Sequence, residues 1–272
     1  MTHAPQIFDR AALLRHRRRA RPDDLFLQQL AVDEVKDRLS LVNRTFKSVA
    51  IVAGFPEIWQ ANFPRAKLVT DSETLDLTAG AHDLVIHAMC LHWANDPVGQ
   101  VIQCRRALLP DGLFLGVLLG GRTLHELRAV LTDAESRASG GISPRVSPMA
   151  EIREAGGLLQ RAGLNLPVAD SQVSVAKYRS LTHLMHDLRD MGESNALTTR
   201  LRRATAPGVF KMAQALYRDE FATEDGYLPA TFELICLTGW SPDDSQPKPL
   251  RPGSARTRLA DALGSKESKL SD

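Results

Sequence analysis

The sequence predicts an α/β protein with a doubly wound, mostly parallel sheet that carries helices on both faces. Two observations lead to this fold class. Residues 83–90 form a continuous apolar run, which is typical of a strand covered on both faces. Strand-like runs also alternate with helix-like stretches from residue 48 to residue 162, and this alternation implies right-handed crossovers between parallel strands.

Local patterns predict the elements of the first half of the chain. In residues 22–42, leucine and valine recur near helical spacing, and Asp23 and Asp24 at the start favour a helix N-terminus through the helix dipole. Short β-rich runs predict the first strands of the sheet. The expected strands are residues 48–53, 67–70, 83–90 and 113–119, and the expected helices are 98–109 and 123–137.

Turn and cap signals separate some of these elements. Pro110-Asp111-Gly112 is a turn sequence that we expect to end the helix before it. Thr123 followed by Glu126 is a capping-box pattern, which predicts that Thr123 caps the helix of residues 123–137.

The second half of the chain is less regular. We expect a helix at 150–162, strands at 168–177 and 231–240, and a helical stretch at 180–222 that breaks at Pro207-Gly208. Few apolar residues follow position 242. The expected organisation is an N-terminal helical segment (1–42), an α/β domain (43–242) with a helical insertion at 180–222, and a disordered tail (243–272).

Charge is balanced overall but uneven along the chain. The net charge of +2 gives no reason to expect nucleic-acid binding. Five arginines crowd the N-terminal segment and are interpreted as a solvated helix face or, alternatively, as a contact for an acidic partner or an anionic membrane: Arg15, Arg17, Arg18, Arg19 and Arg21. We expect no cleavable targeting peptide, because patterned sequence begins at Ile7.

The cysteines and histidines predict neither a disulfide nor a metal site. Cys90, Cys104 and Cys236 have no CxxC spacing, which favours reduced thiols in the cytoplasm. His183 and His186 lie three residues apart on an expected helix, but surface histidines are the simpler interpretation, so we expect no metal. No apolar run reaches the roughly 18 residues that a membrane span needs.

A nucleotide-binding crossover needs glycines between its first strand and its helix, so that backbone N–H groups can approach the ligand. The positions in question, residues 53–57, read AGFPE and hold the single glycine Gly54. Asp71 ends the second expected strand. Its carboxylate either accepts hydrogen bonds from ribose hydroxyls or caps the next turn.

Several motifs together resemble a known family. LHWAND (91–96) and LPDG (109–112) resemble methyltransferases such as the malonyl-carrier-protein methyltransferase of biotin synthesis. Segments that are similar to the mitochondrial complex I assembly factor 5 family and its bacterial relatives are FDR (8–10), GGRTLHELR (120–128), GGISPRVSP (140–148), DLRDMGESN (187–195), EDGYLPATF (224–232) and GW (239–240). The resemblance implies a class I methyltransferase fold, with seven strands and a reversed hairpin at the end of the sheet.

The resemblance also implies S-adenosyl-L-methionine as cofactor, with Gly54, Asp71, His92 and Trp93 as the residues that bind it. The family's first motif is an acidic residue and three alternating glycines. All four of these positions hold other residues here: Ile51, Ala53, Phe55 and Glu57.

The implied partner is a protein client, an iron–sulfur subunit of respiratory complex I. Arg122 and Arg145 would meet acidic groups of the client, and Asp187 and Glu193 would meet basic groups such as an arginine side chain. No residue is assigned as catalytic.

Three functions remain open on this basis. The chain is a cofactor-dependent enzyme that modifies a protein side chain, an inactive pseudo-methyltransferase that acts as a client-binding assembly scaffold, or a protein whose pocket binds another nucleotide or a modified S-adenosylmethionine in a shifted pose. A bacterial cytoplasmic location, with peripheral membrane contact through the basic N-terminus, is the expectation.

Overall fold

The structure is a computed structural model, and it describes residues 6–247, 261 and 264. The chain divides into two compact units, Met1–Pro242 and Asp243–Asp272. Most of the expected disordered tail lies outside the described residues. The expected boundary at residue 42 stays a prediction.

One mixed sheet forms the centre of the first unit, in the order β2-β1-β3-β4-β6-β5. Its strands are β1 (Val49–Ala53), β2 (Lys67–Thr70), β3 (His82–Ala88), β4 (Leu108–Leu119), β5 (Asn165–Tyr178) and β6 (Leu228–Trp240). The first four strands are parallel, whereas β6 is antiparallel to both β4 and β5, which confirms the reversed hairpin.

The sheet has six strands rather than the seven expected. Between β2 and β3 the chain has only residues 71–81, which contain neither strand nor helix. A further parallel strand needs a crossover connection of about a dozen residues or more, so this segment is too short to provide one.

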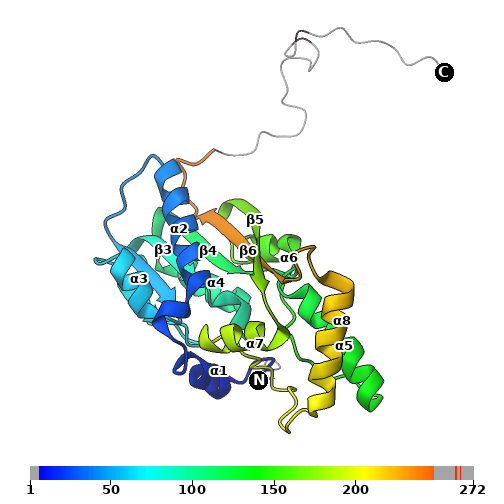
Figure 1. Ribbon diagram of the computed structural model, residues 1–272. Helices are drawn as coiled ribbons and strands as arrows, with labels where there is room; N and C mark the ends of the chain where they lie inside the picture. The colour runs from blue at the N-terminus through cyan, green and yellow to red at the C-terminus, as the bar shows by residue number, and fades with distance from the viewer. Residues whose placement is uncertain (1–5, 248–260, 262–263, 265–272) are drawn as a thin grey trace, which may run out of the picture. The chain divides into compact units, whose positions relative to one another are not determined.

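Helices cover both faces of the sheet, as expected (Figure 1). The face that carries Ile51 and Ile86 packs against α2 (Phe26–Leu41), α3 (Pro56–Asn62), α5 (His125–Ser139), α7 (Leu181–Asp190) and α8 (Pro207–Phe221). The face that carries Val52 and Val85 packs against α4 (Pro97–Ala107) and α6 (Ile152–Arg161). Helix α1 (Arg10–Arg17) belongs to a separate small cluster around Phe8 and Trp93. None of the helices that the structure describes is long and apolar enough to cross a membrane.

Register aligns the carboxyl ends of the first strands. Ala53 pairs with Thr70 on one side and with Ala88 on the other. Residues that directly follow these strands, such as Gly54 and Asp71, therefore meet at one edge of the sheet, where doubly wound folds place their ligands.

The prediction of a capping box, with Thr123 as the N-cap of α5, is wrong. Leu124 is the N-cap residue, at φ +55°, and no side chain caps the helix. The Thr123 hydroxyl instead accepts a hydrogen bond from the backbone of Glu233, and the Glu126 carboxylate accepts one from the Thr231 amide. Both side chains are buried and hydrogen-bond to the backbone of β6. The local sequence does not encode these long-range contacts.

Three other expectations need correction. Pro207 begins α8 rather than breaking a helix, and the break lies in residues 191–206. Residues 110–112 lie inside β4, where Asp111 has φ +57°. The stretch 22–42 divides into a short 3-10 helix, η1 (Pro22–Asp24), and α2.

Candidate functional site

The expected cofactor-binding edge is occupied by two arginines of the N-terminal segment. We call the hollow between Gly54 and Asp71 the cradle. Arg10 donates to both oxygens of Asp71, at 2.9 and 2.6 Å, and Arg17 donates to the same two oxygens at 2.8 and 2.9 Å. The Arg17 and Asp71 side chains are 7% and 3% exposed. The carboxylate that was expected to accept ribose hydroxyls is already fully hydrogen-bonded.

The charge balance favours this closed arrangement. Burial acts to raise the pKa of Asp71, but the hydrogen bonds from Arg10 and the positive charge of Arg17 outweigh it and lower the pKa below its ordinary value. Asp71 is therefore ionised at neutral pH, and two cations surround one anion.

Arg17 also fills the approach to Gly54. A Cβ atom built on Gly54 would lie 2.4 Å from Cζ of Arg17, so the guanidinium takes the space that a ligand needs beside this backbone. The same guanidinium lies 5.9 Å from the centre of the Phe55 ring. Pro56 begins α3 and has no N–H to offer.

The space left in the cradle is too small for the implied cofactor. A cavity of about 120 Å³ remains, bounded by Arg17, Gly54 and Asp71 among others. Small-molecule and cofactor sites usually enclose about 300–1,000 Å³. S-adenosyl-L-methionine does not fit these residues as they are arranged.

Arg10 was not among the predicted site residues, and Arg17 was interpreted as part of a solvated helix face or of a contact for an acidic partner or an anionic membrane. The signal that could have found them is their spacing. The two residues are seven apart, so they lie on the same face of α1, two turns from each other. Arg15, Arg18 and Arg19 of the same run are exposed.

A second cavity, of about 350 Å³, lies beside the cradle at the ends of η2 (Leu91–Trp93) and β4. We call it the Glu193 pocket. Its walls are mostly apolar and include Trp93, Leu119, Met185, Leu188 and Phe232. Its volume lies within the usual range for ligand sites.

Glu193 is the buried carboxylate of this pocket. The Trp93 indole Nε1 donates to its Oε2 at 3.0 Å, and Nε2 of His92 lies 3.6 Å from the same oxygen. Nδ1 of His92 accepts from the Leu119 amide at 3.3 Å, so a neutral His92 ring carries its proton on Nε2, toward Glu193. A carboxylate offers about four acceptor sites, and this one retains capacity for further donors.

The structure thus brings together residues that the sequence assigned to two groups. His92 and Trp93, expected at the cofactor, contact Glu193, expected at the client. Their roles stay predictions, but the carboxylate beside them is that of Glu193 rather than that of Asp71.

The other three expected client-binding residues are dispersed. Arg145 lines the Glu193 pocket, but its guanidinium donates to Glu135 at 2.6 Å and to the Thr205 hydroxyl at 2.6 Å. Asp187 accepts from the Tyr178 hydroxyl at 2.5 Å, and Arg122 is exposed. Their roles also stay predictions.

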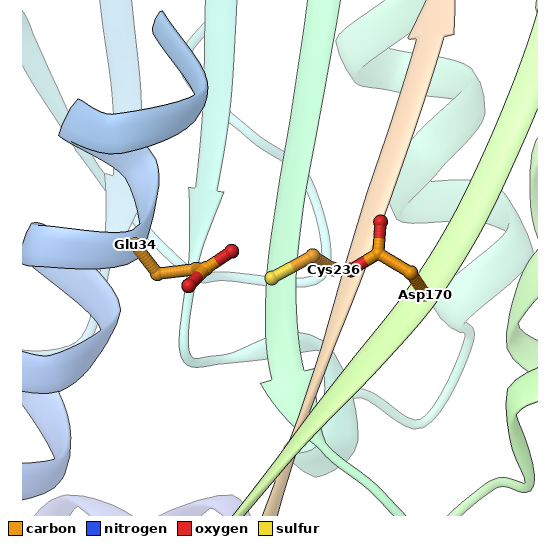
Figure 2. Close-up of side chains that lie close together, drawn as sticks. All are labelled: Glu34, Asp170 and Cys236. Atoms are coloured by element: carbon orange, nitrogen blue, oxygen red, sulfur yellow. The ribbon is translucent and has the colours of Figure 1, made fainter. Parts of the chain in front are cut away.

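One group of metal-ligand type occurs among the described residues. Ligand atoms of Glu34, Asp170 and Cys236 lie within 4.8 Å of one another, on α2, β5 and β6 (Figure 2). Arg38 already supplies the cation: it donates to Asp170 at 2.8 Å and lies 2.7 Å from Glu34. Burial also raises the pKa of the Cys236 thiol to about 12, which opposes metal binding. The group is a partly exposed ion-pair cluster around Arg38.

Several known proteins are similar in sequence to this chain. Residues 34–116 match the family described as a methyltransferase domain. The chain is 38% identical over 204 residues to the arginine-hydroxylase NDUFAF5 of Danio rerio, covering 74% of this chain and 62% of that protein. It is 34% identical over 178 residues to the malonyl-[acyl-carrier protein] O-methyltransferase of Methylovorus, covering 65% of this chain and 57% of that protein. A solved structure, BH2331 of Bacillus halodurans, superposes with a TM-score of 0.48 at 14% identity, covering 78% of this chain and 99% of that one.

Residues 34–116 are thus a methyltransferase domain, and the chain is a homologue of the arginine-hydroxylase NDUFAF5 and of malonyl-[acyl-carrier protein] O-methyltransferases. It spans less than two thirds of the length of these relatives. The expected bacterial cytoplasmic location is wrong on this comparison, because the NDUFAF5 relatives are mitochondrial proteins.

Proposed function

We propose that this chain binds a protein client in the Glu193 pocket during assembly of respiratory complex I, and that it does so without S-adenosyl-L-methionine. The observation that carries this proposal is the closed cradle. Arg17 lies against Gly54 and, with Arg10, occupies both oxygens of Asp71. A scaffold function needs the pocket but not the cofactor.

The pocket suits a long cationic side chain. An arginine could lay its aliphatic stem along the apolar walls and place its planar guanidinium against the Glu193 carboxylate. The NDUFAF5 relatives are named arginine-hydroxylases, which supports arginine as the group bound. An iron–sulfur subunit of complex I is the proposed source of that arginine.

Cofactor-dependent modification of the client is the second candidate. The match of residues 34–116 to a methyltransferase domain favours it, together with an acid, Asp71, at the end of β2. This function requires Arg10 and Arg17 to leave Asp71, which would strand two cations and a carboxylate in a mostly buried site.

Replacing Glu193 by Gln tests the client site. In the source organism with its own copy of the gene deleted, the wild-type chain should restore complex I, as measured on native gels. Glu193→Gln should restore at most about a tenth as much, because loss of a charged hydrogen-bond partner costs about 1.5–3 kcal/mol. Glu220→Gln is the matched control, since Glu220 is an exposed residue of α8. Equal restoration by both variants would remove Glu193 from the client site.

The two candidate functions, cofactor-free client binding and cofactor-dependent modification, differ in whether a nucleoside cofactor copurifies with the protein that restores complex I. Wild-type protein isolated from the same cells and then denatured should release no S-adenosyl-L-methionine or S-adenosylhomocysteine by mass spectrometry. Release of either nucleoside in stoichiometric amount would favour the cofactor-dependent enzyme.

A further inference from the structure

The loop that carries Glu193 lies along the N-terminal segment rather than standing alone. The Arg21 amide donates to the Asp190 carbonyl at 2.7 Å, and Nδ1 of His16 lies 3.1 Å from the Ser194 carbonyl. One strand-like contact extends this pairing, because the Asp9 amide donates to the Ala196 carbonyl at 2.7 Å. The segment 190–196 is therefore held on the N-terminal segment 9–21 by hydrogen bonds along its length.

Gly192 lies at the closest approach between this loop and the cradle. Its φ is +80°, and a Cβ atom built on it would lie 2.9 Å from Cζ of Phe55 and 3.4 Å from Cα of Arg17. The loop therefore rests directly on the Phe55 ring. Phe55 is itself 7% exposed and lies beneath the Arg17 guanidinium.

These contacts form a continuous path between the two sites. Asp71 fixes the Arg17 guanidinium, and Arg17 lies against the Phe55 ring. The ring in turn supports Gly192, whose neighbour Glu193 is the carboxylate of the pocket. In the family pattern, position 55 is a glycine beside the cofactor. Here an aromatic ring occupies it and reaches the client side.

We propose that Arg17 and Phe55 are positioning residues that take the structural place of a cofactor and hold the Glu193 loop in its binding conformation. The replaced glycine motif is then a support for the pocket as well as a lost cofactor site. A loop that is ordered before the client arrives avoids the entropy cost of ordering on binding. The relevance to a client rests on the proposed function, but the support of the loop can be measured without one.

Hydrogen exchange in the full-length protein tests the support directly. The amides of residues 191–193 donate to carbonyls at the end of α7. In Phe55→Gly and in Arg17→Met, these amides should exchange at least tenfold faster than in the wild type, while amides of α6 and β5 keep their wild-type rates. Arg19→Met is the control, because Arg19 is exposed and its side chain is not part of the path; its rates should match the wild type.

Unchanged exchange at residues 191–193 in folded Phe55→Gly protein would overturn the proposal. Exchange that rises uniformly across α6, β5 and the loop would also overturn it, because the residues would then support the whole fold rather than this loop. Phe55→Leu, which keeps apolar bulk, serves if the glycine variant does not fold, and it should still raise exchange at the loop alone.

A double-mutant cycle of Phe55 and Gly192 tests their contact independently. Gly192→Ala places a methyl group against the Phe55 ring and should lower the denaturation midpoint. The same change in a Phe55→Gly background should lower it less, because the clash is gone. Equal shifts in both backgrounds would contradict direct support. If the loop loosens as expected but Glu193→Gln assembles complex I normally, the positioning role stands and the proposed client site fails.

Discussion

The cradle and the Glu193 pocket lie at the same edge of the sheet, and each has an arginine–carboxylate pair in which the arginine borders the cavity. In the cradle the pair fills the space: Arg17 and Asp71 leave a cavity of about 120 Å³. In the Glu193 pocket the pair frames the space: Arg145 and Glu135 hold the wall beside a cavity of about 350 Å³. The difference shows that, at one edge of the sheet, side chains can fill the expected cofactor site while the neighbouring pocket stays open.

The largest expected effect on stability comes from a substitution in the cradle. Asp71→Asn removes the anion that compensates Arg17, whose side chain is 7% exposed, and should lower the free energy of unfolding by about 3–5 kcal/mol. Urea denaturation measures it. Asp190→Asn is the control, because its pair with the 69% exposed Arg21 is 3.9 Å long and should be worth at most about 1 kcal/mol. Similar losses in the two variants would mean that the cradle pair is not a buried, essential one.

A methyl group at Gly54 tests whether the cradle is full. Gly54→Ala must displace the Arg17 guanidinium, which is anchored by Asp71, and should destabilise the protein by about 1–3 kcal/mol. Gly157→Ala in α6 meets no atom within 4 Å and should instead stabilise by up to about 1 kcal/mol through helix propensity. Thermal denaturation of the two variants compares them, and a neutral Gly54→Ala would indicate open space in the cradle.

The Arg145–Glu135 pair predicts that the stability of the folded protein depends on pH. Hydrogen bonds from Arg145 lower the pKa of Glu135 from 4.5 to about 2. Because the folded-state pKa is depressed, the stabilisation is complete above pH 4.5 and is lost as the pH falls through about 2. Glu135→Gln should cost about 1.5 kcal/mol at pH 7. The difference from the wild type in urea midpoint should shrink as the pH falls below 4.5. A difference that stays constant from pH 7 to pH 2.5 would contradict this assignment.

Local patterns were enough to predict most of the fold. The strand at 67–70 was predicted with its observed bounds, because short β-rich runs between turns are encoded locally. The N-cap at Thr123 was wrong because β6, more than 100 residues away in sequence, hydrogen-bonds Thr123 and Glu126. Tertiary contacts of this kind override a local cap signal.

The candidate site was predicted less well, for a related reason. Loss of the glycine motif was visible in the sequence, but the residue that fills the vacated space was not. Arg17 belongs to a run of arginines that individually resemble a solvated face. Only the tertiary fold, which places α1 beside the ends of β1 and β2, brings it to Asp71. Phe55 was interpreted as an obstacle to the cofactor, and its contact with Gly192 is likewise a tertiary contact, between residues far apart in the sequence.

Calorimetric titration of S-adenosyl-L-methionine into the full-length protein tests the filled cradle most directly. We predict no heat of binding up to about 1 mM ligand, because binding would have to displace Arg10 and Arg17 from Asp71. Micromolar binding that disappears in Asp71→Ala would contradict the account, since it would mean that the arginines yield to the cofactor and that the cradle is a working cofactor site.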